Sequence, residues 1–172
     1  MLAGGNVADL AMLLARLVLC VVFVAHGLNH IFGGGKIKGT ARWFEGLGMS
    51  PGWLHAWTAS VTELGSGILL GLGLITPIAA GGVVGVMAVA WATNHARNGF
   101  FIFRPGEGYE YVMVLAVLAV AVAALGAGGW SLDHALGLQA DLAGWAGLGI
   151  AAGSGLAGAG ALLGVFWRRP SH

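Results

Sequence analysis

Apolar residues gather in five long stretches of the chain, and polar residues gather in the four gaps between them. A helix needs about 17–25 residues to cross roughly 30 Å of hydrocarbon, and each stretch is close to that length. The pattern therefore predicts an all-α membrane protein with five transmembrane helices. The expected spans are Leu10–Phe32, Trp53–Ile75, Pro77–Ala96, Tyr109–Leu125 and Leu142–Trp167.

Basic residues are distributed unevenly over the gaps. Seven of the eight lysines and arginines fall in the first gap, in the third gap or after the last stretch. Because Lys and Arg are enriched in cytoplasmic loops, five spans predict a multi-pass protein of the inner (cytoplasmic) membrane, with the N-terminus outside and the C-terminus in the cytoplasm. The eighth basic residue, Arg16, lies near the outer interface, where we expect its side chain to snorkel to the headgroups.

Composition narrows the classes of function. The chain is 58% hydrophobic and 9% charged with a mean hydropathy of +0.84, a surface that a soluble domain of this size could not solvate. A formal net charge of +1 offers no basic field for nucleic acid, so we expect the lipid bilayer and membrane proteins as partners. A single cysteine, Cys20, excludes an intrachain disulfide or a CxxC couple. Redox chemistry would therefore need a bound cofactor or a partner protein.

The last stretch carries small residues at every fourth position. Small residues in lipid let helix backbones approach closely, so this stripe predicts a packing surface. We expect it to pack on the rest of the bundle, and the alternative is that a partner redox protein docks on the Gly147/Gly155 face. The stripe consists of Ala143, Gly147, Ala151, Gly155 and Ala159.

Ionisable side chains inside the spans are the candidate functional groups, because charge in the membrane is costly to maintain. The candidates for cofactor binding all belong to the cytoplasmic half of the predicted bundle: His26, His30, Glu63, His95 and Glu110. Three of them, His26, Glu63 and His95, come from three different helices and are predicted to converge on one pocket. These three are also the catalytic candidates.

Each candidate has a structural alternative. Glu63 could form an internal ion pair instead of exchanging protons. Glu110 could simply stabilise the N-terminus of its helix, where the helix macrodipole favours a negative charge. His26 and His30 lie one helical turn apart and cannot supply both axial ligands of one haem. His95 on another helix could complete a haem-ligating pair, but haem is not the favoured interpretation. His26, His30 and Glu63 could hold a zinc or iron ion, but no HExxH-type motif supports a metal site, and none is expected. The cofactor stays open, with a quinone as the candidate that an apolar slot ending in a carboxylate or imidazole would suit.

Four short motifs resemble the DoxX family of bacterial membrane proteins, and they occur in the family's order between about Leu10 and Leu138. The first surrounds the histidine candidates and the second surrounds Glu63. The four are Ala25-His26-Gly27-Leu28 with Ile31-Phe32-Gly33; Glu63-Leu64-Gly65-Ser66-Gly67 leading to Gly71-Leu72-Gly73-Leu74-Ile75-Thr76-Pro77; Gly108-Tyr109-Glu110-Tyr111; and Gly126-Ala127-Gly128-Gly129-Trp130-Ser131-Leu132-Asp133.

The resemblance implies a four-helix membrane core, here residues 1–138, that works beside redox enzymes. Family relatives act as the membrane subunit of a thiosulfate:quinone oxidoreductase, and actinobacterial ones organise a thiol-stress complex with superoxide dismutase and a sulfurtransferase. His30 departs from the family's common lysine, and residues 139–172 add a Gly/Ala-rich fifth span with a short basic tail. Two hypotheses follow: a membrane subunit of a redox-associated complex with a quinone-binding or proton-exchanging pocket on the cytoplasmic side, or a non-catalytic anchor and assembly subunit.

The charge bias makes a direct prediction about topology. A reporter fused to the C-terminus should be active only if the reporter functions in the cytoplasm, because the basic gaps are retained on that side. If a C-terminal tag is accessible only from outside the cell, both the five-span count and the cytoplasmic placement of the candidate residues are contradicted.

Overall fold

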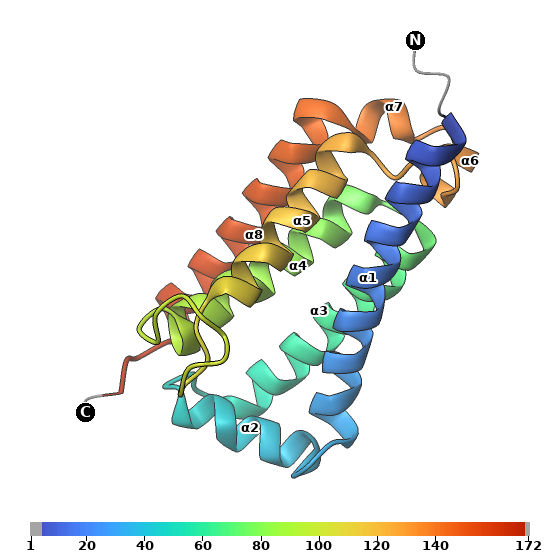
Figure 1. Ribbon diagram of the computed structural model, residues 1–172. Helices are drawn as coiled ribbons and strands as arrows, with labels where there is room; N and C mark the ends of the chain where they lie inside the picture. The colour runs from blue at the N-terminus through green and yellow to red at the C-terminus, as the bar shows by residue number, and fades with distance from the viewer. Residues whose placement is uncertain (1–4, 171–172) are drawn as a thin grey trace.

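Long antiparallel helices make up most of this computed structural model, which describes residues 5–170 (Figure 1). A π-helical turn, η1, extends α4 at its end, and two single-turn helices precede the last long helix. The elements are α1 (Gly5–Phe32), α2 (Lys36–Gly46), α3 (Gly52–Leu72), α4 (Thr76–Ala90), η1 (Trp91–His95), α5 (Glu110–Leu125), α6 (Leu132–Ala135), α7 (Gln139–Leu142) and α8 (Gly144–Phe166).

Hydropathy and burial together indicate a protein whose outer helix surfaces face lipid. Within residues 5–170, three segments are long and apolar enough to cross a membrane, Val7–Phe32, Thr76–His95 and Gly144–Phe166, and α5 is a shorter apolar helix. The 21-residue α3 is more polar, but its polar side chains His55, Ser60, Glu63 and Ser66 are buried, whereas Trp53, Trp57, Val61 and Ile68 on its outer side are exposed. The prediction of an all-α, multi-pass membrane protein is confirmed.

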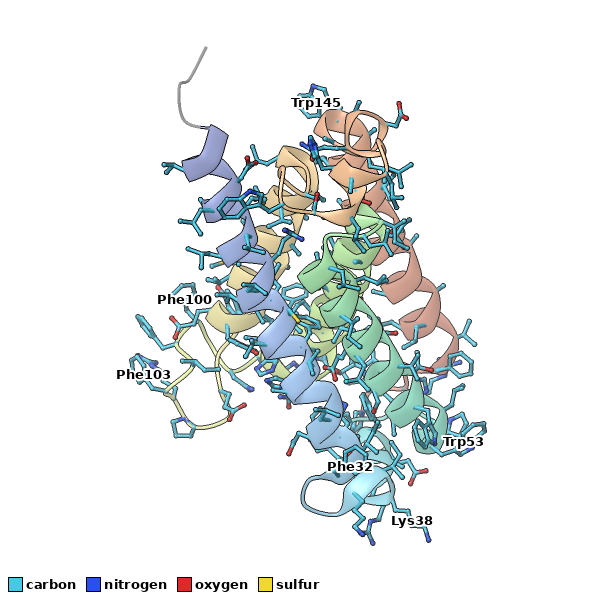
Figure 2. The ribbon with its side chains drawn as sticks, turned by 90° about the vertical axis from the view of Figure 1, so that its right-hand side faces the viewer. Phe32, Lys38, Trp53, Phe100, Phe103 and Trp145 are labelled. Carbon is cyan, nitrogen blue, oxygen red and sulfur yellow. The ribbon has the colours of Figure 1, made fainter. Side chains whose placement is uncertain are left out.

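Two groups of helices form the bundle. α1 packs along α3, and α4 packs on α5 and α8 and joins α3 through a short turn (Figure 1). α2 lies across the end of the bundle that also holds the loop between η1 and α5 and the end of α8. We call this the basic end, because seven basic residues lie there, Lys36, Lys38, Arg42, Arg97, Arg104, Arg168 and Arg169. In Figure 2, Lys38 marks the basic end of the bundle and Trp145 marks the opposite end.

The small-residue stripe of α8 faces the interior of the same chain. Gly147, Ala151, Gly155 and Ala159 are buried. A Cβ added at Gly155 would lie 2.6 Å from the carbonyl oxygen of Gly81 and 2.7 Å from Cβ of Val84, both on α4. The alternative in which the Gly147/Gly155 face docks a partner is therefore wrong, because α4 and α5 already cover that face.

The prediction that Arg16 snorkels to the interface is wrong, because its side chain is fully buried. Its guanidinium donates hydrogen bonds to the carbonyl oxygens of Leu70 (3.2 Å) and Gly71 (3.4 Å) at the end of α3, and of Trp130 (2.6 Å) in the loop after α5. A helix C-terminus leaves carbonyls without partners inside the helix and carries partial negative charge. One arginine thus ties α1, α3 and the α5–α6 loop together.

Asp133 holds the same region from the other side. Its two carboxylate oxygens accept hydrogen bonds from the backbone N–H groups of Ile75 (2.7 Å) and Thr76 (3.0 Å) at the start of α4. Its own N–H donates to the carbonyl oxygen of Gly73 at 2.8 Å. Gly73 has φ +64, and a side chain there would collide with the Arg16 guanidinium. The α3–α4 turn is therefore clamped by a buried cation and a buried anion.

Substitutions on α8 test the packing of the stripe. Gly155→Leu should lower the stability of the folded protein by about 1–3 kcal/mol, because a larger side chain forces α8 away from α4. Gly160→Leu is the matched control, since an added Cβ there meets nothing within 4 Å. Thermal unfolding in detergent should separate the two variants, and equal midpoints would contradict the close α4–α8 contact.

Removing the buried arginine tests the clamp. Arg16→Leu leaves three carbonyl oxygens without their donor, so we expect a loss of about 1–3 kcal/mol in unfolding free energy. Arg16→Lys should lose less, because it keeps the charge but not the fork of donors. Arg168→Leu serves as the control, since among residues 5–170 its guanidinium bonds only to carbonyls of its own segment, Gly164 and Trp167. If Arg16→Leu unfolds at the wild-type temperature, the clamp does not contribute to the free energy of unfolding.

Candidate functional site

Glycines bring α1 and α3 into close contact and so set how the two helices align. A Cβ added at Gly27 would lie 2.8 Å from Cγ of Leu64, and one at Gly67 would lie 3.0 Å from Cγ2 of Val24. A Cβ at Gly71 would lie 2.8 Å from Sγ of Cys20. With no side chain at these points, the backbones approach and the antiparallel alignment is determined. That alignment brings the histidines of α1 beside Glu63 of α3.

Four polar side chains meet where α1, α3 and α5 face one another. Oε2 of Glu63 lies 3.3 Å from Nδ1 of His30, and the Glu63 side chain is 5% exposed. Neither of these two atoms forms a hydrogen bond of regular geometry within residues 5–170. One turn earlier on α1, Nε2 of His26 lies 3.2 Å from the hydroxyl of Tyr111 on α5. The cluster therefore combines a carboxylate, two imidazoles and a phenol, with unsatisfied polar atoms on Glu63 and His30.

This cluster lines a cavity of about 720 Å³ in the half of the bundle nearer the basic end. Its size falls within the ~300–1,000 Å³ range of pockets that enclose most of a drug-sized ligand. The apolar and glycine wall comes mainly from α4, α8, α2 and the loop before α2, whereas the ionisable groups come from α1, α3, η1, the η1–α5 loop and α5. The wall of α4 and α8 includes Gly82, Gly85, Val86, Val89, Gly158, Ala159 and Leu162.

His95 also lines the cavity, but both of its ring nitrogens already have partners. Nδ1 lies 2.8 Å from the carbonyl oxygen of Glu107 and therefore donates to it, and the side-chain nitrogen of Asn94 lies 3.3 Å from Nε2. The π-helical turn η1 carries Asn94 and His95, and π-helical turns in α-helices are frequent at functional sites. His95 thus attaches the η1–α5 loop to the cavity wall.

Glu110, the fifth candidate, lies outside the cavity lining. Its carboxylate accepts a hydrogen bond from the backbone N–H of Ile102 at 2.9 Å, within the η1–α5 loop. This loop presents aromatic side chains outward, and Figure 2 shows Phe100 and Phe103 projecting away from the helices. Glu110 therefore stabilises the η1–α5 loop and does not belong to the cluster around Glu63.

Sequence reasoning missed two cavity residues. Tyr111 follows Glu110 in the third motif, but its partner His26 is 85 positions away, and no local pattern joins them. His55 is 2% exposed at the start of α3, where its ring lies 6.1 Å from that of Phe44 and 5.3 Å from that of Phe166. A histidine within a predicted span was the available signal for His55. Among residues 5–170, no three His, Cys, Asp or Glu side chains are grouped to hold a metal ion.

The geometry gives the family motifs physical roles. Gly27, Gly67 and Gly71 are the close-contact glycines of α1 and α3, and His26 and Glu63 belong to the polar cluster. The sequence profile of the DoxX family matches residues 11–96, which include these positions but not the third and fourth motifs. Neither a curated protein nor a solved structure matches the chain. The profile covers half of the sequence, and the chain belongs to the DoxX family.

Proposed function

We propose that this protein is the membrane subunit of a redox-associated complex and that its cavity binds a quinone head group beside Glu63 and His30. The observation that carries the proposal is the cavity of about 720 Å³ itself, which joins an apolar wall to one cluster of ionisable groups. A quinone needs this combination, because its ring and tail are apolar and its two carbonyl oxygens accept hydrogen bonds or protons.

The cluster has the groups that proton exchange requires. Reduction of a quinone to a quinol consumes two electrons and two protons, and we assign the electrons to a partner redox protein. The protons would pass through Glu63 and His30, which are 3.3 Å apart and therefore within reach of sharing one proton. His26 and Tyr111 form a second donor–acceptor pair at 3.2 Å. His95 has the role of a positioning residue, because its two nitrogens are held by Asn94 and Glu107.

Burial of Glu63 favours a functional role. A carboxylate at membrane depth is costly unless it is paired, protonated or bound to a ligand, and Glu63 has an oxygen without a regular hydrogen bond. A purely structural ion pair would gain from satisfying that oxygen. With the charge-based orientation, the cavity belongs to the cytoplasmic half of the membrane, where protons would be taken from the cytoplasm.

Glu63→Gln tests the proposal, since the amide keeps the shape of the side chain but cannot exchange a proton. In purified protein reconstituted into lipid, we expect at least a tenfold weaker quinone affinity, about 1.4 kcal/mol, and loss of proton uptake when a bound quinone is reduced chemically. The unfolding temperature should stay near the wild-type value.

Glu110→Gln is the matched control, because Glu110 lies near the same end of the bundle but outside the cavity. It should bind quinone as the wild type does. If Glu63→Gln lowers thermal stability and leaves quinone binding unchanged, Glu63 is a structural partner of His30. The chain would then be the non-catalytic anchor of its complex.

A further inference from the structure

The cavity has an opening in the side of the bundle, between α3 and α8. Thr58 and Thr62 on α3 and Ser154 and Gly158 on α8 all line the cavity. Thr58, Ser154 and Gly158 are also exposed on the surface of the bundle. An added Cβ at Gly158 would meet nothing within 4 Å. We call the surface formed by these four residues the α3–α8 portal.

Contacts of the end of α8 with the start of α3 and with the loop before it separate the portal from the basic end. The N–H of Ser50 donates to the carbonyl oxygen of Phe166 at 3.3 Å, and Met49 pairs with Trp167 in a short antiparallel bridge. The ring of His55 packs on that of Phe166. Gly158 lies eight residues before the end of α8, which places it about 12 Å deeper along the helix. The portal therefore opens at the depth of the hydrocarbon.

The floor of the portal suits a flexible apolar chain. It is formed by α4, where Gly82, Gly85 and Val89 line the cavity. An added Cβ at Gly85 would lie 3.3 Å from the carbonyl oxygen of Gly155, so the two helices meet closely behind it. The floor offers no ionisable group, and the portal's only polar side chains are hydroxyls.

We propose that the α3–α8 portal is the path by which the ligand of the cavity enters from the bilayer, and that it holds the isoprenoid tail of a quinone whose ring lies at Glu63. This inference rests on the proposed function and specifies the ligand as lipid-soluble and long-tailed. The cavity also has exposed lining at the basic end, from Asn29, Gly34, Gly35 and Glu107, where a water-soluble ligand would enter. A ligand dissolved in the bilayer reaches the portal without leaving lipid.

Two tryptophan substitutions on α8 test the portal with quinone probes. Gly158→Trp fills the opening, whereas Gly160→Trp lies on the opposite flank of the buried stripe, also with open space around its Cβ. The probes are a benzoquinone with a ten-carbon tail and the same ring without the tail, measured with protein in lipid nanodiscs. Gly158→Trp should weaken or slow binding of the tailed quinone at least tenfold. It should leave the tail-less quinone unchanged, because that probe has no tail to place in the portal and can enter at the basic end. Gly160→Trp should alter neither, and unchanged binding of the tailed quinone to Gly158→Trp overturns the portal.

A readout without any quinone separates the portal from the proposed function. A nitroxide attached to Gly158→Cys in a Cys20→Ala background should collide more often with membrane-soluble oxygen than with a water-soluble nickel complex. Greater accessibility to the nickel complex would overturn the portal whatever the cavity binds. If oxygen dominates but the wild type binds neither quinone, the portal stands and the quinone assignment fails.

Discussion

The antiparallel alignment of α1 on α3 is the constraint on which the rest of the molecule depends. Glycines at three successive points let the two backbones approach, and Arg16 fixes the far end by bonding to the last carbonyls of α3. A slip of α1 by one turn would separate Arg16 from these carbonyls and His30 from Glu63 together. In lipid, where apolar surfaces gain little by meeting each other, such close contacts and internal hydrogen bonds decide how helices associate.

The two ends of the bundle use polar groups differently. At the end away from the basic residues, Arg16 and Asp133 each hydrogen-bond to two or more backbone groups, although Nε of Arg16 has no partner among residues 5–170. These bonds hold the α3–α4 turn and the loop after α5 in place. Nearer the basic end, Glu63 and His30 retain polar atoms without regular hydrogen bonds, and they face a cavity. A charge held by several backbone groups in a packed region stabilises structure, whereas a polar group without a regular hydrogen bond that lines a cavity is available to a ligand. This contrast supports a binding role for the cavity.

Hydropathy predicted the membrane fold, and the charge pattern placed His26, His30, Glu63 and His95 toward the basic end, because both depend on one-dimensional patterns. The burial of Arg16 was not predicted. His26, His30, Glu63 and His95 do line one cavity, although helical periodicity alone shows only which residues share a face of one helix. The partners of Arg16 and Tyr111 could not be predicted, since they lie 54 or more positions away in the chain. The direction of the α8 stripe and the placement of Glu110 likewise depend on tertiary packing.

Photo-crosslinking tests the central claim most directly, because it reports where a quinone lies. A quinone with an azido group on its ring would be irradiated with the reconstituted protein, and the labelled peptides identified by mass spectrometry. The account predicts labelling on α1 near His26 and His30 and on α3 near Glu63, with loss of the label when excess unlabelled quinone is present. Labelling spread over the exposed side of α5, or labelling that excess quinone does not reduce, would contradict a quinone site in the cavity.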